Sequence, residues 1–291
     1  MNKIFYKPSR CSSREQAEKG YEGKGKRAIL LEMTRKKGES IMSYTCVPLS
    51  QRPELEAEMP RLHSESWPEF VLNDPIAIRY WGSLFSTFAD FQYVLCDEND
   101  FALAAGHAIP FAWDGTVEGL PSGWDAALEQ GFHDYEQGRT PTALCGLSIV
   151  IAPGLQGKGL SESMAREMKA IAVEHRLRDL VIPLRPSLKS SYPLIAMEEY
   201  MQWKREDGEP FDPWLRIHWR LGAKVIGIAP LSMVITETVS KWEEWTGQRF
   251  ATSGIYPVAG ALSPIVIDCE RDQGRYEEPN IWIHYANVVS T

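Results

Sequence analysis

The chain has 291 residues, of which 44% are hydrophobic and 24% are charged, and its formal net charge is −8. This composition is typical of a soluble globular protein with room for one large domain or two modest ones. No apolar run approaches the roughly 20 residues that a membrane-spanning helix needs, and the N-terminus lacks the apolar core of a secretory signal, so the expected location is the cytoplasm.

The cysteines and histidines argue against two kinds of small structural site. The five cysteines are odd in number and widely spaced, without a CxxC pair, and the six histidines show no HxxH or HExxH spacing. The cysteine pattern fits neither a disulfide framework nor a zinc site, and the histidines do not place two ligands on one helix face. We therefore expect reduced thiols and no protein-bound metal.

Charge is distributed unevenly along the chain. Residues 1–42 contain eleven Lys and Arg against five Glu, a net charge of +6, although the whole chain is acidic. This segment is also poor in periodic apolar residues. It is interpreted as a basic, flexible N-terminal extension rather than as an arm that binds nucleic acid or a membrane surface.

The first part of the chain predicts strands and helices that lead into a hairpin. In chain order these are a strand at 43–49, an amphipathic region at 53–70, a helix at 76–88 and strands at 91–96 and 102–113. A spacing of four keeps Ile76, Tyr80 and Leu84 on one helix face. The polar turn at 97–100 predicts that the two later strands form an antiparallel pair.

Two long segments interrupt this alternation. Residues 114–142 are rich in Gly, Pro and acidic residues around a predicted short helix at 124–135, and residues 186–209 contain a helix-like run at 194–203. Long excursions from a compact domain often carry function. We interpret both as insertions in a single domain over residues 43–291.

The second part of the chain begins with a nearly continuous apolar strand, as expected for a central position in a sheet. It is followed by predicted elements at 160–175 (helix), 180–184 (strand), 213–221 (helix), and 224–229, 232–239, 255–258, 263–268 and 280–285 (strands). Asp212 suits the N-cap of the second helix, Pro213 its first position and Gly222 its end. The last strands predict a β-rich C-terminal part.

The turn between the apolar strand at 142–152 and the helix at 160–175 is the strongest functional signal. A Gly-rich turn that leads from a strand into a helix N-terminus presents unpaired backbone N–H groups to an anion. A Walker loop is excluded because Ala152 stands at the first Gly position and Gly159 at the hydroxyl position. A Rossmann fingerprint fits poorly because Glu162 replaces the third Gly and several strands precede the turn.

A third pattern, Gln-x-x-Gly-x-(Gly/Ala), fits this turn. It is realised as Gln156-Gly157-Lys158-Gly159-Leu160-Ser161. The segment resembles the coenzyme A pyrophosphate loop of the GNAT superfamily of N-acyltransferases, with Ser161 at the usual Gly or Ala position. The order of predicted elements over residues 43–230 is similar to that family as well.

The resemblance implies a fold, a donor and a binding mode. The fold is α/β of the α+β type: a mixed, mostly antiparallel central sheet, splayed at its middle strands and flanked by helices, here with a β-rich C-terminal extension. The donor is acetyl-CoA or another acyl-CoA, with no metal. The loop residues 156–161 would hold its diphosphate, and the backbone of Leu147 and Ile149 would pair with its pantetheine arm.

A second motif is similar to the family pattern Tyr-x-x-x-Gly-Phe, whose Tyr is the general acid. The chain has His218-Trp219-Arg220-Leu221-Gly222-Ala223, which places His218 at the Tyr position. The resemblance therefore makes His218 the candidate acid, since an imidazole can protonate a departing thiolate near neutral pH. Tyr192 and Tyr200 are the fallback acids, and the general base is not identified among Asp134, Glu198, Glu199 and Asp212.

These observations predict an acyl-CoA-dependent N-acyltransferase that acetylates an amine of a small molecule, with no nucleic-acid or membrane partner. The acidic portion after residue 42 favours a cationic acceptor. The alternative is a degenerate, non-catalytic coenzyme A-binding or interaction protein, which the replacement of Tyr by His218 permits. The ten Trp and the two insertions leave a homodimer interface open.

Overall fold

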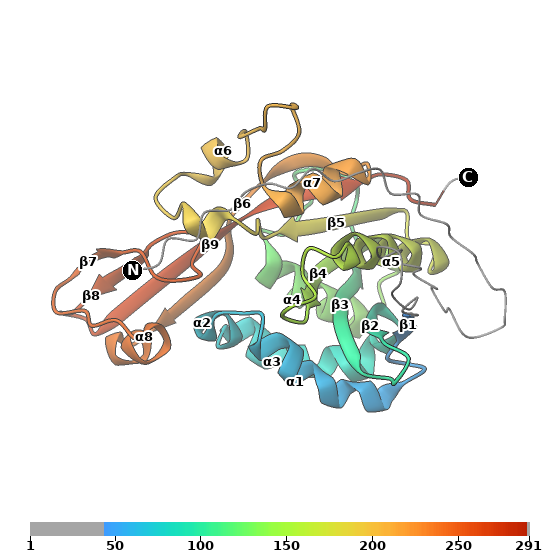
Figure 1. Ribbon diagram of the computed structural model, residues 1–291, viewed down its shortest axis with the longest axis horizontal. Helices are drawn as coiled ribbons and strands as arrows, with labels where there is room; N and C mark the ends of the chain where they lie inside the picture. The colour runs from blue at the N-terminus through green and yellow to red at the C-terminus, as the bar shows by residue number, and fades with distance from the viewer. Residues whose placement is uncertain (1–43, 290–291) are drawn as a thin grey trace, which may run out of the picture.

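The computed structural model of the protein describes residues 44–289, and the predicted basic extension at 1–42 lies outside them. Within this described part, no helix is long and apolar enough to cross a membrane. The described strands form one sheet with helices on both faces (Figure 1).

The sheet has nine strands in the described residues. They are β1 (Thr45–Pro48), β2 (Gln92–Cys96), β3 (Ala102–Phe111), β4 (Ala143–Ile151), β5 (Asp179–Leu184), β6 (Lys224–Glu237), β7 (Gly254–Tyr256), β8 (Ile265–Asp268) and β9 (Gln273–Tyr285). The order is β1-β2-β3-β4-β5-β9-β8-β7, with β6 pairing to β9. Only β4 and β5 run parallel, and the other pairs are antiparallel. The predicted mixed, mostly antiparallel sheet and the β-rich C-terminal part are confirmed.

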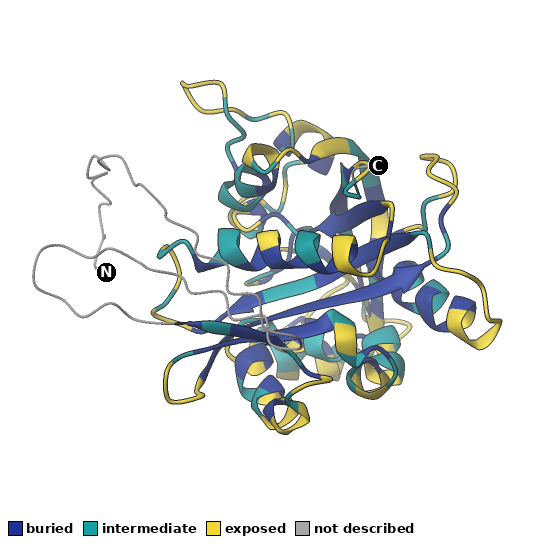
Figure 2. Cartoon of the chain, turned by 90° about the vertical axis from the view of Figure 1, so that its right-hand side faces the viewer, coloured by how far each residue is buried: buried dark blue, intermediate teal, exposed yellow. Residues whose placement is uncertain are grey.

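The helices form two layers (Figure 2). They are α1 (Met59–Ser64), α2 (Glu69–Leu72), α3 (Pro75–Thr87), α4 (Trp124–Glu136), α5 (Leu160–Glu174), α6 (Met197–Tyr200), α7 (Pro213–Arg220) and α8 (Val239–Thr246), with 3-10 turns η1 (Pro53–Glu58), η2 (Ala89–Phe91) and η3 (Lys189–Ser191). On one face, α5 buries Met164 and Met168 in a core shared with Leu144 and Leu180. The opposite face is covered by α3 and α4, whose apolar residues join a second core.

Strand β9 joins parts of the sheet that are distant in sequence. Its residues 274–284 pair with β6 along one edge. On the other edge, residues 281–285 pair with β5 and residues 273–275 pair with β8. The stretch between those two pairings contains Glu278 and Asn280, both buried. The C-terminal strand is therefore an interior strand of the sheet.

Several predicted elements differ from the observed ones. The runs at 224–229 and 232–239 are one strand, β6, whose register against β9 shifts between Ala229 and Met233. The helix-like run at 194–203 forms only the single turn α6, while β9 is seven residues longer at its start than the run at 280–285. Helix α8 was not predicted, because its first residue, Val239, reads as the end of the preceding apolar run.

Candidate active site

The parallel strands β4 and β5 separate along their length. Their pairing covers only Ala143–Cys145 against Asp179–Val181, although both strands continue. Beyond it, residues 146–149 of β4 and 182–184 of β5 line a cavity of about 550 Å³, which we call the β4–β5 cavity. The predicted splay of the middle strands is thus the opening of this cavity.

A β-bulge shapes the β4 side of the cavity. His107 of β3 pairs with Ser148 and Ala108 pairs with Gly146, so Leu147 is the extra residue in β4. A bulged residue is left out of the ladder, and its backbone groups are re-aimed. The carbonyl oxygen of Leu147 accepts a hydrogen bond from the Trp124 indole N–H at 2.8 Å. A carbonyl oxygen has two lone pairs, so this hydrogen bond leaves one acceptor position of Leu147 for another partner.

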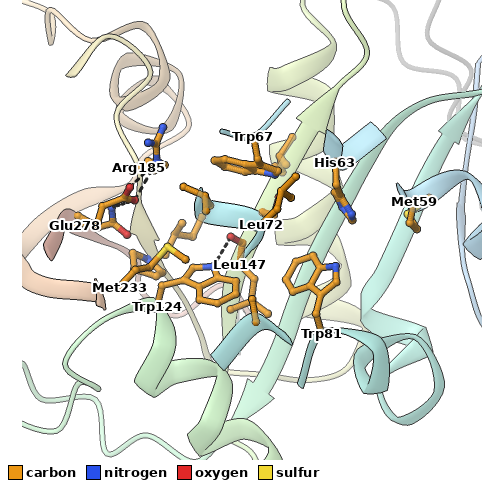
Figure 3. Close-up of a pocket in the computed structure, with 18 of the residues that line it drawn as sticks. Met59, His63, Trp67, Leu72, Trp81, Trp124, Leu147, Arg185, Met233 and Glu278 are labelled. Carbon is orange, nitrogen blue, oxygen red and sulfur yellow. Dashed lines mark hydrogen bonds and ion pairs between the residues drawn. The ribbon is translucent and has the colours of Figure 1, made fainter. Parts of the chain in front are cut away.

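Apolar and aromatic side chains from α1 to α4 form most of the cavity wall (Figure 3). The labelled wall residues include Met59, His63, Trp67, Leu72, Trp81 and Trp124. Trp81 stacks on Trp124 with ring centroids 5.8 Å apart. The insertion at 114–142 therefore contributes a wall of the cavity through α4.

One end of the cavity is polar and largely closed to solvent. Arg185, just after β5, forms an ion pair with the fully buried Glu278 of β9, with Nε 3.0 Å from Oε1. Glu278 also accepts hydrogen bonds from the Tyr276 hydroxyl at 2.7 Å and the Asn280 amide at 3.1 Å. Arg185 donates through Nη2 to the carbonyl of Gly260 at 2.6 Å. This network places a carboxylate and a guanidinium side by side in an otherwise apolar wall.

Two further carboxyl groups are buried close to this network. The pKa of Asp125 is raised to about 8, first by burial and then by Asp74, and Glu278 raises it further. Burial also raises the pKa of Asp74 to about 6. One oxygen of each carboxyl group has no hydrogen-bond partner among the described residues. Neither carboxyl group lines the cavity, and the raised pKa keeps Asp125 largely protonated at neutral pH, so the charges at this end of the cavity are those of Glu278 and Arg185.

The Gly turn lies between β4 and α5, two residues after β4 ends. Gly154, Gly157 and Gly159 all have positive φ angles, of 79°, 74° and 87°. Gly159 is the N-cap of α5 and no side chain caps the helix, so its first N–H groups are available to an anion. Gln156 and Gly157 are exposed, Lys158 and Ser161 are half-buried, and the side chain of Leu160 is in the core, which leaves only the backbone of Leu160 for binding.

His218 is buried beside the cavity and does not line it. Its Nδ1 is 2.7 Å from the Tyr285 hydroxyl, and its Nε2 has no hydrogen-bond partner among residues 44–289. Burial lowers the pKa of His218 to about 3. The Trp214 ring, which does line the cavity, lies against the imidazole with ring centroids 4.1 Å apart.

The fallback acids lie in the second insertion, away from the cavity wall. Tyr200 is fully buried, its hydroxyl donates to Asp212 at 2.9 Å, and burial raises its pKa well above its usual value. Tyr192 is about one-third exposed and packs edge-on against Trp203. Neither tyrosine lines the cavity.

The candidate bases Asp134 and Asp212 hydrogen-bond to structural partners, and their side chains do not line the cavity. Asp134 accepts from the Ala112 N–H at 2.8 Å and pairs with Arg139. Glu198 and Glu199 are exposed on α6. None of the four carboxylates contributes to the cavity wall in the described structure.

Asp212 connects the second insertion to α7, so its substitution tests how much this connection contributes to the stability of the fold. Its oxygens accept from the N–H groups of Leu188, Trp214 and Leu215 and from the Tyr200 hydroxyl. Asp212→Ala removes the helix cap and leaves buried donors unpaired, so we expect the free energy of unfolding to fall by about 3 kcal/mol. Urea unfolding followed by tryptophan fluorescence measures this loss.

Tyr200→Phe is the matched control, because it removes only one of the five donors, the Ser187 hydroxyl at 3.5 Å being the fifth. We expect it to lower the free energy of unfolding by about 1 kcal/mol. Equal losses in the two variants would contradict the connecting role of Asp212.

Sequence reasoning did not single out four residues that line the cavity: His63, Trp124, Arg185 and Glu278. Arg185 and Glu278 are 93 positions apart, and no local pattern connects them. Glu278 follows Glu277 and precedes Pro279 and Asn280, a polar run that carries no local signal of burial. No group of three or more His, Cys, Asp or Glu in the described part of the chain is arranged to hold a metal ion.

Comparisons with known proteins found a relative by sequence and solved structures with a similar fold. No protein-family model matches the chain. The arginine N-acetyltransferase avaD of Aspergillus versicolor is 31% identical over 248 residues, which are 76% of this chain and 85% of that protein. The loading GNATL domain of CurA from Lyngbya majuscula superposes with a TM-score of 0.53 at 18% identity, over 84% of this chain and 97% of that one. The similarity to the loading domain shows a shared fold.

Proposed function

The chain belongs to the GNAT superfamily of N-acyltransferases, and on that premise we propose that it transfers an acetyl group from acetyl-CoA to an amine of a small cationic amino acid. The observation that carries the proposal is the β4–β5 cavity, which opens where two parallel strands separate and continues along the strand that leads into the Gly turn. Arginine is the first acceptor to test, because the sequence relative is named for it.

The Gly turn supports the donor part of the proposal. At Gly157 an added Cβ would meet no atom within 4 Å, so the space above its backbone is open to a ligand. The uncapped N-terminus of α5 and the half-buried Lys158 favour a diphosphate at this position. We assign this contact to residues 156–161, with Ile149 along the pantetheine path.

The polar end of the cavity supports the acceptor part. Glu278, which is fully buried, and the largely buried Arg185 line this end of the cavity and form an ion pair with each other. The cation of a bound amino acid would find a negative partner in Glu278, and its carboxylate would find a positive partner in Arg185. A zwitterion with an extra cation fits both requirements.

The general acid is a separate part of the proposal, and His218 is its first candidate. His218 holds the motif position of the general acid, but Trp214 separates its imidazole from the cavity. Neither Tyr200 nor Tyr192, the fallback acids, lines the cavity.

Ligand binding and turnover test the proposed function. Saturation at about a hundred times the dissociation constant stabilises the folded state by about 2.7 kcal/mol. This corresponds to a rise in melting temperature of roughly 5–10 °C for a domain of this size. We expect acetyl-CoA to give that rise in differential scanning fluorimetry, and arginine to cause release of free thiol from acetyl-CoA.

A neutral amine of similar length serves as the control acceptor and should react more slowly. The absence of a melting shift at millimolar acetyl-CoA, with the protein shown to be folded, would overturn the donor assignment. Binding without thiol release across a panel of amines would instead favour the non-catalytic alternative.

A further inference from the structure

A chain of three side chains connects β2 to the wall of the β4–β5 cavity. Gln92 of β2 contacts His107 of β3, and His107 contacts His63 of α1. The Gln92 Oε1 atom is 3.1 Å from His107 Nδ1, and the two histidine Nε2 atoms are 3.0 Å apart. Gln92 and His107 are fully buried, while His63 lines the cavity.

The fixed end of this chain is the Gln92 amide. Its Nε2 is 2.9 Å from the carbonyl oxygens of Phe88 and Ala108. Carbonyl oxygens only accept hydrogen bonds, so the NH₂ group must face them and Oε1 must face His107. The orientation of the amide is therefore determined by the backbone.

The amide in turn determines the position of each proton. Because Oε1 only accepts, His107 Nδ1 carries the proton and its Nε2 holds a lone pair, as long as the ring is neutral. That lone pair accepts the proton on His63 Nε2. His63 Nδ1 is therefore the atom with a free lone pair.

Both rings are held neutral by their surroundings. Burial lowers the pKa of His63 to about 4, and burial together with His63 lowers the pKa of His107 well below its usual value. The residues packed on the pair from α3 are aromatic, Trp81 and Phe85. On α1 itself, Arg61 pairs with Glu58 and Glu65. Among the described residues, the titratable group facing His63 is thus His107.

His63 Nδ1 is accessible. It has no hydrogen-bond partner among the described residues, and it is not one of the fully enclosed side-chain atoms that lack a partner. Since His63 lines the cavity, an atom of its ring that is both unpartnered and accessible can receive a hydrogen bond from a molecule bound there.

We propose that His63 Nδ1 is the general base that accepts the proton of the acceptor amine, with Gln92 and His107 as positioning residues that fix its tautomer. This assignment rests on the proposed function. The amine nitrogen forms a bond to the thioester carbonyl carbon, and its proton passes to Nδ1. The C–S bond then breaks, the thiolate leaves, and the imidazolium returns a proton to solvent while the thiolate gains one, so that coenzyme A leaves as the thiol.

The test compares His63→Gln with the wild-type chain in the acetyl-CoA and arginine assay. A Gln side chain can still donate to His107, but it supplies no base, so we expect kcat to fall about 100-fold. The melting shift caused by acetyl-CoA should be unchanged. His133→Gln, the same substitution at an exposed histidine outside the cavity, should keep wild-type kcat.

Two further measurements separate a base from a structural residue. His63→Ala leaves a space in the cavity wall, and added imidazole should raise the kcat of this variant at least tenfold. In wild-type protein, ¹⁵N NMR should show His63 with an unprotonated Nδ1 and a protonated Nε2. The proposal is overturned by wild-type kcat in His63→Gln, by failure of imidazole to restore His63→Ala, or by the opposite tautomer.

The outcome also distinguishes the base assignment from the proposed function. If the wild-type chain binds acetyl-CoA but acetylates no amine, the proposed function fails and the base assignment fails with it. If the wild-type chain is active and only the His63 results disagree, the function stands and His63 is not the base.

Discussion

Glu278→Ala is expected to lower the free energy of unfolding by about 3–5 kcal/mol, one of the two largest effects that we predict. Glu278 is fully buried, and its removal leaves the largely buried Arg185 guanidinium without a counterion. Breaking a buried ion pair by removing one partner is strongly destabilising for this reason. The Tyr276 hydroxyl and the Asn280 amide lose an acceptor as well. Urea unfolding at equilibrium measures the loss.

Two matched variants show whether the buried charge is the cause. Glu277→Ala removes the neighbouring carboxylate, which is exposed and pairs with the exposed Arg275, so we expect a loss below about 1 kcal/mol. The double variant Arg185→Met with Glu278→Met removes both charges and should recover more than half of the stability lost in Glu278→Ala. A double variant as unstable as the single one would contradict this explanation.

Gly157→Ala is expected to weaken acetyl-CoA binding by at least tenfold. The φ angle of 74° places this residue in the left-handed region, and an added Cβ would enter the open space where we place the diphosphate. Isothermal titration calorimetry with coenzyme A measures the change in affinity.

Gly154→Ala provides a control from the same turn. Gly154 has a similar φ angle of 79° and open space around it, but it precedes the coenzyme A motif. Both variants should lose about 1–2 kcal/mol of stability, because an Ala side chain is strained in this region. Only Gly157→Ala should lose affinity, and an equal loss in Gly154→Ala would argue that the contact with the diphosphate is not specific to residues 156–161.

Much of the fold could be predicted from local patterns. The N-cap Asp212 with Pro213 located α7, and the apolar run before the Gly turn located β4, because capping chemistry and strand burial leave local signals. The sequence did not show that the runs at 224–229 and 232–239 form one strand, β6. The residues at 230–232 read as a break, although the strand continues through an irregular register there. Single-residue changes in register depend on the partner strand and leave no mark in one sequence.

The site was predictable only where a motif is contiguous. The Gly turn falls within nine residues, so its spacing could be compared with known loops. His63 of α1 contacts His107 of β3, which in turn contacts Gln92 of β2, so this group of side chains joins three elements. The Leu147 bulge likewise appears only when β4 is aligned with β3. Interactions that form between distant elements were therefore absent from the sequence-based description.

The position of β9 has a consequence for the order in which the sheet assembles. The strand that closes the sheet against β5, β6 and β8 is the last of the strands in residues 44–289. Until residues 281–285 have paired with it, the apolar strand β5 presents an open edge, and such edges promote aggregation. Pairing between strands so far apart in sequence is also intrinsically slow. Completion of the sheet is therefore a late step of folding, because it must wait for residues 273–285 to reach partners that are distant in sequence.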